Sequence, residues 1–227
     1  RQGMKLLDVA CGTGVVALTA SRQGIEVEGI DLTPELINRA NENSKIMGLK
    51  AKFVEGDAEF LPYKENEFDI ILSQYGHMFA PRPAVVVKEL ARVLKPGGIL
   101  AFSTWPKELF MGKFFKLIES FSEPLPSEVA SPVLWGDMAV IEDRLKDHFN
   151  QIEFGRDTMF APTMSPGHML KLFEKNAGPL ANLVKALAND PTKLSNLRNA
   201  ALELIENFFS NNFLRQDFLM TRCIKKV

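Results

Sequence analysis

The stretch LLDVACGTGVVALTA, residues Leu6 to Ala20, decides how this sequence folds. A run of apolar residues meets Gly12 and Gly14, and a small, helix-compatible segment follows directly. Glycine adopts backbone conformations that other residues avoid, and without a side chain it lets a ligand approach the main chain. The stretch therefore predicts a strand, a glycine turn and a helix beside a binding site.

Short apolar segments alternate with helix-periodic segments from Lys5 to Trp105. The helix that starts at Pro34 has clear signals, because Thr33 is a favoured N-cap residue and Gly48 a favoured stop. Such alternation is typical of a parallel sheet with helices on both faces. The predicted strands are Lys5–Ala10, Glu26–Asp31, Lys52–Glu55, Phe68–Ser73 and Ile99–Thr104, and the predicted helices are Gly14–Gln23, Pro34–Met47 and Pro83–Leu94.

The rest of the chain is less regular and predicts more helix than strand. Its predicted helices are Phe110–Phe121, Trp135–Phe149, Pro166–Asn176, Pro179–Asn189 and Lys193–Ser210, and its predicted strands are Gln151–Phe160 and Phe213–Cys223. We expect segments 106–134 and 162–212 to be substrate-side additions around the carboxyl edge of the sheet, where open α/β sheets bind ligands. The expected fold is a Rossmann-like, doubly wound, mostly parallel seven-stranded α/β sheet with an added helical cap. It forms a single domain over residues 1–227, with a cofactor-binding core in residues 1–105.

Composition narrows the class of protein. The 27 basic and 28 acidic side chains give a net charge of −1, so no basic excess predicts a nucleic-acid partner. Cys11 and Cys223 are the only cysteines, which argues against a disulfide framework, and no Cys/His spacing resembles a zinc site.

No apolar run approaches the roughly 18–20 residues that span a bilayer. We expect a cytoplasmic protein without a membrane span, and we expect residues upstream of Arg1 to be missing. The oligomeric state is left open.

The glycine turn by itself is compatible with two kinds of ligand. Gly12, Gly14 and Ala17 match the G-x-G-x-x-G/A pattern of dinucleotide sites, and Asp31 ends the next strand, where a ribose-binding acid belongs. Turns of this type also bind S-adenosylmethionine. Asp8, four residues before Gly12, favours the second ligand, because a carboxylate beside a pyrophosphate would repel it, whereas S-adenosylmethionine carries an ammonium and a sulfonium. Capping of the turn's amides is the alternative role for Asp8.

The residues after the third predicted strand point in the same direction. In EGDAEFLP, residues 55–62, Asp57 is placed to accept a hydrogen bond from an adenine amine, with an apolar neighbour against the ring. An ordinary strand-exit turn is the alternative. The sequences FDIILSQY at 68–75 and ELARVLKPGGIL at 89–100 then predict a strand, a helix, a Gly-Gly turn and another strand.

In this order and spacing, the motifs resemble those of the class I S-adenosylmethionine-dependent methyltransferases, over residues 5–105. The resemblance is strongest to methyltransferase type 11 and to the ubiquinone/menaquinone-biosynthesis enzymes. The matching stretches are DVACGTG at 8–14, Asp31, GDA at 56–58, FDIILS at 68–73 and LKPGG at 94–98.

The resemblance implies roles for individual residues. Gly12 and Gly14 would let the backbone approach the methionine part of the cofactor, with Ala10 and Cys11 lining the turn. Asp31 would accept both ribose hydroxyls, with Leu32 against the adenine. Asp57 would meet the adenine amine beside Ala58, and Ser73 would approach the methionine ammonium through its carbonyl. We interpret Cys11 as a space-filling residue rather than a nucleophile.

Methyl transfer from a sulfonium needs little covalent help, since proximity and alignment supply most of the rate. A general base is needed only for a weakly acidic acceptor, and Tyr75 and His77 are the candidates. For His77, a packing or hydrogen-bonding role is favoured over that of a base. No metal site is expected, because the segment GHMFAPRP at 76–83 supplies no carboxylates.

The methyl acceptor is predicted only by class. Most of the 17 Phe follow residue 100, which favours a small apolar or aromatic acceptor if they line the site, and a packed core if they do not. Two other functions stay open: a nicotinamide-dependent oxidoreductase, and a non-catalytic partner subunit that keeps the cofactor fold.

Overall fold

The computed structural model describes residues 3–124, 126 and 129–227. Among these residues, eight strands form one sheet with the order β3-β2-β1-β4-β5-β8-β6, and β7 pairs with β8. The pairs among β1 to β5 are parallel, whereas β7 and β8 are antiparallel. The strands are β1 Lys5–Val9, β2 Glu26–Asp31, β3 Lys52–Glu55, β4 Phe68–Gln74, β5 Leu94–Thr104, β6 Phe149–Pro162, β7 Phe209–Ser210 and β8 Phe213–Lys225. The expected Rossmann-like fold is confirmed, with the two-residue β7 added to the predicted seven strands.

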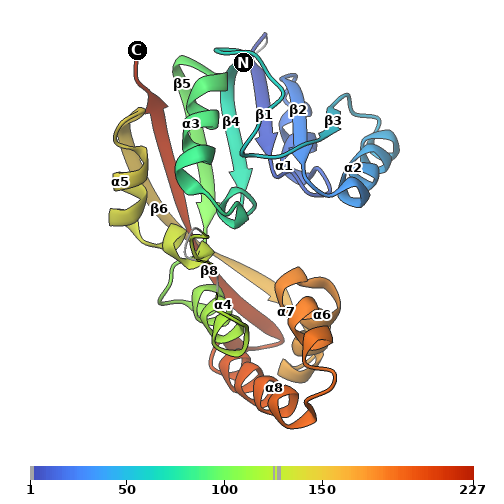
Figure 1. Ribbon diagram of the computed structural model, residues 1–227. Coiled ribbons are helices and arrows are strands. Elements are labelled where there is room, and N and C mark those ends of the chain that lie inside the picture. Colours follow the sequence, from blue (N-terminus) through green and yellow to red (C-terminus); the bar gives the residue numbers. More distant parts are fainter. Residues whose placement is uncertain (1–2, 125, 127–128) are drawn as a thin grey trace. The chain divides into compact units, whose positions relative to one another are not determined.

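Helices follow most of the strands. Figure 1 shows α1 and α3 on opposite faces of the sheet, as the doubly wound prediction requires. No helix in the described part of the chain is long and apolar enough to cross a membrane. The α-helices are α1 Val15–Ser21, α2 Pro34–Met47, α3 Pro83–Val93, α4 Phe110–Phe121, α5 Met138–Leu145, α6 Pro166–Asn176, α7 Gly178–Ala186 and α8 Pro191–Glu206, and two 3₁₀ helices are η1 His77–Phe79 and η2 Pro132–Gly136.

The Lys95–Gly98 turn shows how the local sequence shapes an element. Strand β5 starts at Leu94, which pairs with Phe68, and the next pair along the two strands joins Ile70 to Ile99. The KPGG segment is therefore a bulge within β5 rather than a loop before it. Gly97 accounts for the bulge, because its φ of +73° is a conformation that residues with a side chain rarely adopt.

Two predicted helices are shorter in the structure. The segment predicted as one helix over Trp135–Phe149 consists of η2 and α5, because the Asp137 side chain accepts a hydrogen bond from the Ala139 N–H and starts a new helix there. The helix predicted to reach Ser210 ends at Glu206, and Phe209 and Ser210 pair with β8 instead. Tertiary pairing thus outweighs the helical pattern at this end.

The described residues form two compact units. The first comprises residues within 1–104, 128–155 and 220–227, and the second comprises residues within 105–127 and 156–219. In the first unit, one core cluster joins β1, β2 and β3 to α1 and α2. Its buried members are Leu6, Ala17, Leu18, Val27, Ile37, Ala40 and Phe53. This cluster fixes the glycine turn, because Gly14 lies directly beside the Phe53 ring.

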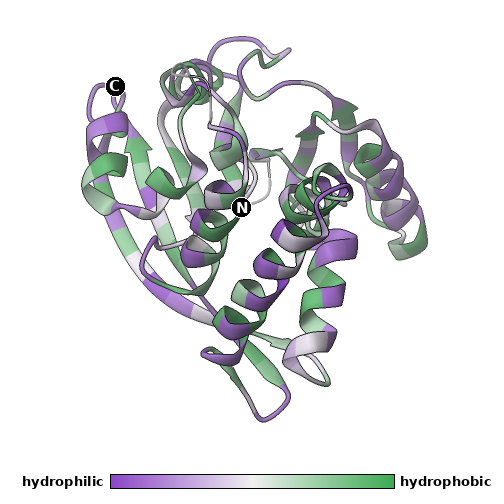
Figure 2. Cartoon of the chain, turned by 60° about the horizontal axis from the view of Figure 1, so that its bottom comes forward, coloured by the Kyte–Doolittle hydropathy of each residue, from purple (hydrophilic) through white to green (hydrophobic). Residues whose placement is uncertain are grey.

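The second unit has a core of its own. Its helices carry polar and apolar residues on different sides (Figure 2), and α8 buries Leu197, Ala201 and Ile205 along one stripe. The Phe110 and Phe114 rings are buried and stacked at 5.6 Å between centroids, and Phe173 packs 5.0 Å from Phe114. These phenylalanines therefore form a packed core. The role of segments 106–134 and 162–212 as a substrate-side cap stays a prediction, as does the single-domain organisation.

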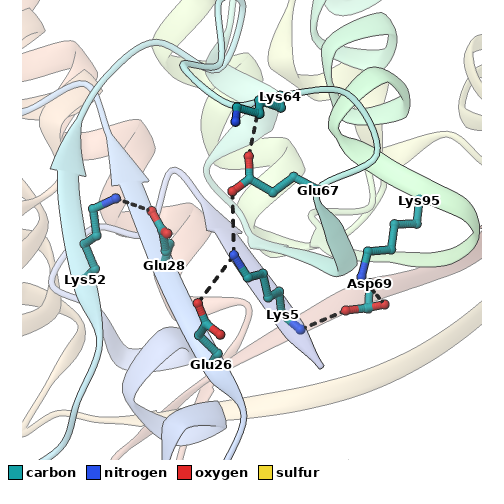
Figure 3. A network of polar contacts seen from close by, with 8 residues as sticks. All are labelled: Lys5, Glu26, Glu28, Lys52, Lys64, Glu67, Asp69 and Lys95. Carbon is teal, nitrogen blue, oxygen red and sulfur yellow. Dashed lines mark hydrogen bonds and ion pairs between the residues drawn. The ribbon is translucent and has the colours of Figure 1, made fainter. Parts of the chain in front are cut away.

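Ion pairs connect the amino ends of the parallel strands (Figure 3). Lys5 Nζ lies 3.5 Å from Glu26 and 3.8 Å from Glu67, while its main-chain N–H donates to Asp69 at 2.9 Å. Lys95 pairs with the same Asp69 at 2.8 Å. In the same region, Lys52 pairs with Glu28 at 2.9 Å and the Lys64 N–H donates to Glu67. At this edge of the sheet, called the amino edge below, carboxylates are neutralised by lysines.

Candidate functional site

A cavity of about 550 Å³ lies at the opposite edge of the sheet, where β1, β2 and β3 end. We call it the edge cavity. Its lining includes predicted site residues from four separate segments. These are Ala10, Gly12, Asp31, Leu32, Asp57, Ala58 and His77. Larger hollows of about 660 and 850 Å³ border Glu28 and Lys52 near the amino edge, and neither includes residues of the glycine turn.

The glycine turn has the backbone conformation that the sequence predicts. Ala10, Gly12 and Gly14 have φ angles of +54°, +55° and +83°. A side chain at Gly12 would meet nothing within 4 Å, whereas one at Gly14 would lie 2.7 Å from the Phe53 ring. Gly12 thus keeps the backbone open beside the cavity, and Gly14 allows the turn to pack against the core.

Asp31 connects the glycine turn to the end of β2. Its Oδ2 accepts a hydrogen bond from the Gly12 N–H at 2.8 Å, and its Oδ1 accepts one from the Thr33 N–H at 2.9 Å. The residue is 8% exposed, so the carboxylate is fixed in place while still bordering the cavity. Each carboxylate oxygen has a second acceptor site, so both remain able to bind a pair of ligand hydroxyls. Leu32, which is 67% exposed, adds an apolar wall beside it.

Asp57 and Ala58 lie in the turn after β3. The Asp57 Oδ1 accepts from the Glu59 N–H at 2.8 Å, which orients the exposed carboxylate at the cavity. Within the described residues, its Oδ2 accepts no hydrogen bond, so this oxygen could accept one from a ligand amine.

Glu59 is a lining residue that the sequence did not point to. It is buried, and its two oxygens accept from the Arg82 N–H at 2.6 Å and the Arg82 Nε–H at 2.7 Å. This pair ties the turn after β3 to Arg82, the N-cap of α3, and the cavity is bordered by Glu59 itself and by Pro81, the residue before Arg82. No periodic pattern relates residues so far apart, so only the fold brings them together.

Asp8 lies beneath the turn rather than in the cavity. It is 1% exposed, and its Oδ2 accepts from the Ala17 N–H at 3.0 Å. Burial raises the pKa of this carboxyl from 3.8 to about 7, the Ala17 hydrogen bond opposes the shift, and the negative charge of Asp31 adds to it. The observed contact is the capping alternative, and ligand binding by Asp8 stays a prediction.

Cys11 is half-buried within the same turn. Its Sγ lies 3.8 Å from the Gly12 carbonyl, and a side chain at Gly29 would come within 3.0 Å of it. Burial raises the pKa of the thiol, so the reactive thiolate is disfavoured. These observations support the space-filling role.

Ser73 and His77 are linked at the end of β4. The Ser73 hydroxyl donates to the Val9 carbonyl at 2.8 Å, and its oxygen lies 3.1 Å from His77 Nδ1. The His77 ring is 1% exposed and packs edge-on against Phe102 and Trp135, with centroids 4.5 and 4.6 Å away. Burial, assisted by the charge of Arg144, lowers its pKa to about 3. This environment favours the packing and hydrogen-bonding role over that of a base.

Tyr75 adopts a left-handed backbone conformation with a φ of +60°, and its N–H donates to the Ser103 carbonyl at 3.0 Å. Its half-buried side chain is not among the lining residues of the edge cavity. Among the residues that the structure describes, no group of three or more His, Cys, Asp or Glu side chains could hold a metal ion.

Comparison with known proteins gives a consistent result. A profile of the methyltransferase domain matches residues 7–102. An uncharacterized protein of Mycobacterium tuberculosis is 32% identical over 221 residues, covering 97% of this chain and 81% of the relative. Demethylmenaquinone methyltransferase of Staphylococcus aureus is 41% identical over 103 residues, covering 44% of this chain and 42% of that enzyme.

The fold is also similar to solved structures. One is phosphoethanolamine N-methyltransferase 2 of Haemonchus contortus in complex with S-adenosyl-L-methionine. The TM-score is 0.62 with 18% identity, and the match covers 100% of this chain and 50% of the other. At this identity the likeness concerns the fold alone.

Proposed function

Because the chain belongs to the class I methyltransferases that depend on S-adenosylmethionine, we propose that it transfers the cofactor's methyl group to a small organic acceptor at the edge cavity. The lining of the cavity is the observation that carries the proposal. It contains three carboxylates, Asp31, Asp57 and Glu59, the last of which pairs with Arg82, and no lysine or arginine is found in the lining among the described residues. The histidine in the lining, His77, is neutral because burial lowers its pKa to about 3. A pyrophosphate would be repelled there, whereas a cationic nucleoside without phosphate would be attracted.

The cavity also fits this cofactor in size and in hydrogen-bonding groups. Its volume of about 550 Å³ lies within the range of small-molecule sites. In the proposal, Asp31 binds the ribose hydroxyls through its remaining acceptor sites, and Asp57 accepts from the adenine amine. Leu32 and Ala58 supply apolar contacts, and the open backbone at Gly12 leaves room for the methionine part, while Gly14 lets the turn pack against the Phe53 ring.

When bound, S-adenosylmethionine supplies a methyl group already activated by the positive sulfur, with a neutral leaving group. The protein then has to hold cofactor and acceptor in line and exclude water. The fixed carboxylate of Asp31 and the Glu59–Arg82 pair serve this positioning, because they hold the walls of the cavity in place. Ala10 belongs to the same wall, Ser73 lies outside the lining and bonds to Val9 next to Ala10, and Cys11 fills space behind the wall.

His77 is assigned no proton-transfer step. With a pKa of about 3, the ring is neutral at physiological pH and too weak a base to hold a proton taken from an acceptor. Tyr75 stays the candidate for contacting the acceptor. No metal takes part in the proposed reaction.

The acceptor is proposed to be small and apolar or aromatic. Support comes from the apolar residues Leu32 and Phe79 at the cavity and from a relative named for demethylmenaquinone. A cytoplasmic location and the lack of a nucleic-acid partner belong to the same proposal and rest on the sequence alone. The family assignment favours methyl transfer over the nicotinamide alternative.

Calorimetry with S-adenosylhomocysteine tests the proposal. Asp31→Ala is expected to weaken binding by roughly 1–3 kcal/mol, the scale for loss of hydrogen bonds to a carboxylate. Glu153→Ala, which alters a pair between exposed side chains, is the control and should bind like the wild type. Unchanged affinity in the Asp31 variant would overturn the assignment of the cavity. A wild-type protein that binds the cofactor but never turns it over with any acceptor pool would instead favour a non-catalytic partner subunit.

A further inference from the structure

The Ser73–His77 pair joins two walls of the edge cavity. Ser73 ends β4, and its hydroxyl reaches across to the carbonyl of Val9, the last residue of β1. The residue after Val9 is Ala10, which lines the cavity. Any change in the Ser73 hydroxyl therefore acts on the backbone directly beneath the proposed cofactor.

The hydrogen bonds of Ser73 determine the tautomer of His77. A serine hydroxyl has one hydrogen, and the Val9 carbonyl, which can only accept, takes it at 2.8 Å. The Ser73 oxygen then accepts from the His77 main-chain N–H at 3.2 Å and faces His77 Nδ1 at 3.1 Å. Two groups without a hydrogen between them would repel at this distance, so Nδ1 carries the proton and Nε2 a lone pair.

The surroundings of the ring keep this arrangement fixed. Phe102 comes from β5, and Trp135 comes from η2, so the ring is enclosed by aromatic side chains. Arg144 of α5 is the charged group that acts on it, and it disfavours a second proton. Nε2 has no hydrogen-bond partner among the described residues, which leaves Ser73 as the only side chain that orients the ring by a hydrogen bond.

The turn between the two residues packs against the glycine turn. A side chain at Gly76 would lie 2.4 Å from the Ala10 Cβ and 2.7 Å from the Ala10 oxygen. Gly76, Ala10 and His77 all line the edge cavity. Because Ser73 and His77 flank Gly76 and bond to each other, they hold it against Ala10.

We propose that His77, as the neutral tautomer protonated on Nδ1, is a positioning residue that sets the shape of the cofactor site by donating a hydrogen bond to Ser73. The inference rests on the proposed function, since it needs the edge cavity to bind the cofactor. It assigns His77 a role in affinity for the cofactor and none in the chemical step.

Two variants of equal shape separate this role from simple packing. His77→Asn keeps an N–H donor near the position of Nδ1, whereas His77→Leu has similar size and no donor. Both lose the aromatic packing and should lose thermal stability to a similar degree. His77→Asn is expected to bind S-adenosylhomocysteine within about threefold of the wild type, and His77→Leu about tenfold or more weakly. The KM for S-adenosylmethionine should rise in the same order while kcat changes little.

Ser73→Ala keeps the test decisive if the histidine variants fold poorly. It removes the shared hydroxyl and should weaken binding as much as His77→Leu. The double variant should be no weaker than either single one, because both remove the same contact. His148→Leu, which changes an exposed histidine of the same unit, is the control and should bind like the wild type. Nitrogen NMR should find the His77 proton on Nδ1 between pH 5 and 8.

Equal affinities of the Asn and Leu variants, additive losses in the double variant, or a proton on Nε2 would each overturn the inference. A wild-type protein that fails to bind S-adenosylhomocysteine would overturn the proposed function instead, so the two failures are distinguishable.

Discussion

The two edges of the parallel sheet hold their carboxylates in different ways. At the amino edge, Glu26, Glu28 and Asp69 each pair with a lysine (Figure 3). At the carboxyl edge, Asp8 and Asp31 accept hydrogen bonds from main-chain N–H groups, and no ion pair to a lysine or arginine is recorded for either one in the described chain. Main-chain donors fix the position of a carboxylate without cancelling its charge.

In the proposed function, the carboxylates at the carboxyl edge stay available to a ligand, whereas those at the amino edge are already paired with lysines. The amino-edge pairs involve partly exposed lysines, and such pairs contribute little because solvent screens them. At the carboxyl edge, Asp8 and Asp31 are buried, and burial raises the pKa of Asp8 to about 7. A positive ligand arriving at that edge finds uncompensated negative charge in a place of low dielectric, where attraction is strongest.

The largest expected loss of cofactor affinity comes from a substitution where the turn after β4, at Gly76, packs against the glycine turn, at Ala10. Gly76→Ala would place a methyl group 2.4 Å from Ala10 Cβ, so one wall of the edge cavity must move. We expect about 100-fold weaker binding of S-adenosylhomocysteine by calorimetry, since overpacking costs about 1–3 kcal/mol. Gly178→Ala, where a new side chain meets nothing within 4 Å, is the control. Normal binding by the Gly76 variant would show that this wall is not part of the site.

Asp8→Asn tests whether the carboxyl edge is under electrostatic strain. The folded-state pKa of about 7 lies above the ordinary 3.8, so the protonated form favours folding. The stability that this group provides is complete below about pH 3.8 and is lost as the pH rises through 7. Asparagine does not titrate, so the variant should gain stability over the wild type by up to about 4 kcal/mol well above pH 7 and far less at pH 5. Thermal unfolding at pH 5 and 8.5 measures the gain, and a gain independent of pH would contradict the raised pKa.

The same carboxyl also predicts how cofactor affinity depends on pH. A cation near Asp8 favours the ionised carboxylate, so affinity for S-adenosylmethionine should rise several-fold between pH 6 and 8. The rise should be absent in Asp8→Asn. Equal pH dependence in both proteins, measured by calorimetry, would mean that Asp8 only caps the helix.

Glu59→Gln should have a moderate effect. The buried carboxylate binds Arg82 through both oxygens, and the amide replaces one acceptor with a donor that faces the guanidinium. We expect the KM for S-adenosylmethionine to rise about fivefold, with lower thermal stability, because a charge-assisted contact is lost. Glu108→Gln, in the exposed pair with Arg156, should leave both unchanged. An effect of the same size in the control would point to net charge as the cause.

The smallest effect is expected at the amino edge. Lys52→Met removes the partner of Glu28 at a side chain that is 65% exposed. The free energy of unfolding should fall by no more than about 0.5–1 kcal/mol in urea denaturation, and cofactor affinity should not change. A loss of affinity would remove the distinction between the two edges.

The sequence predicted those parts of the fold that local rules determine. Strand β2 and helix α2 have the predicted bounds, because Thr33, Pro34 and Gly48 signal where the helix begins and ends. The gathering of Asp31 and Asp57 was predictable as well, since parallel strands end at one edge.

Contacts between segments that are far apart in the sequence could not be predicted from these local signals. The aromatic enclosure of His77 requires Trp135, and the Glu59–Arg82 pair requires two loops to meet. Phe209 and Ser210 continue a helical pattern, yet they pair with β8 because an available strand outweighs helix propensity. Asp8 was expected to serve the ligand, with capping of main-chain amides as the alternative, and the structure shows the bond to the Ala17 N–H.

Comparing two ligands on the intact chain tests the central claim most directly. Calorimetry at pH 7.5 should find that S-adenosylmethionine binds about 100-fold more tightly than NADH, because the lining of the edge cavity has three carboxylates and, among the described residues, no lysine or arginine. Tighter binding of NADH, or no binding of S-adenosylmethionine, would contradict the account.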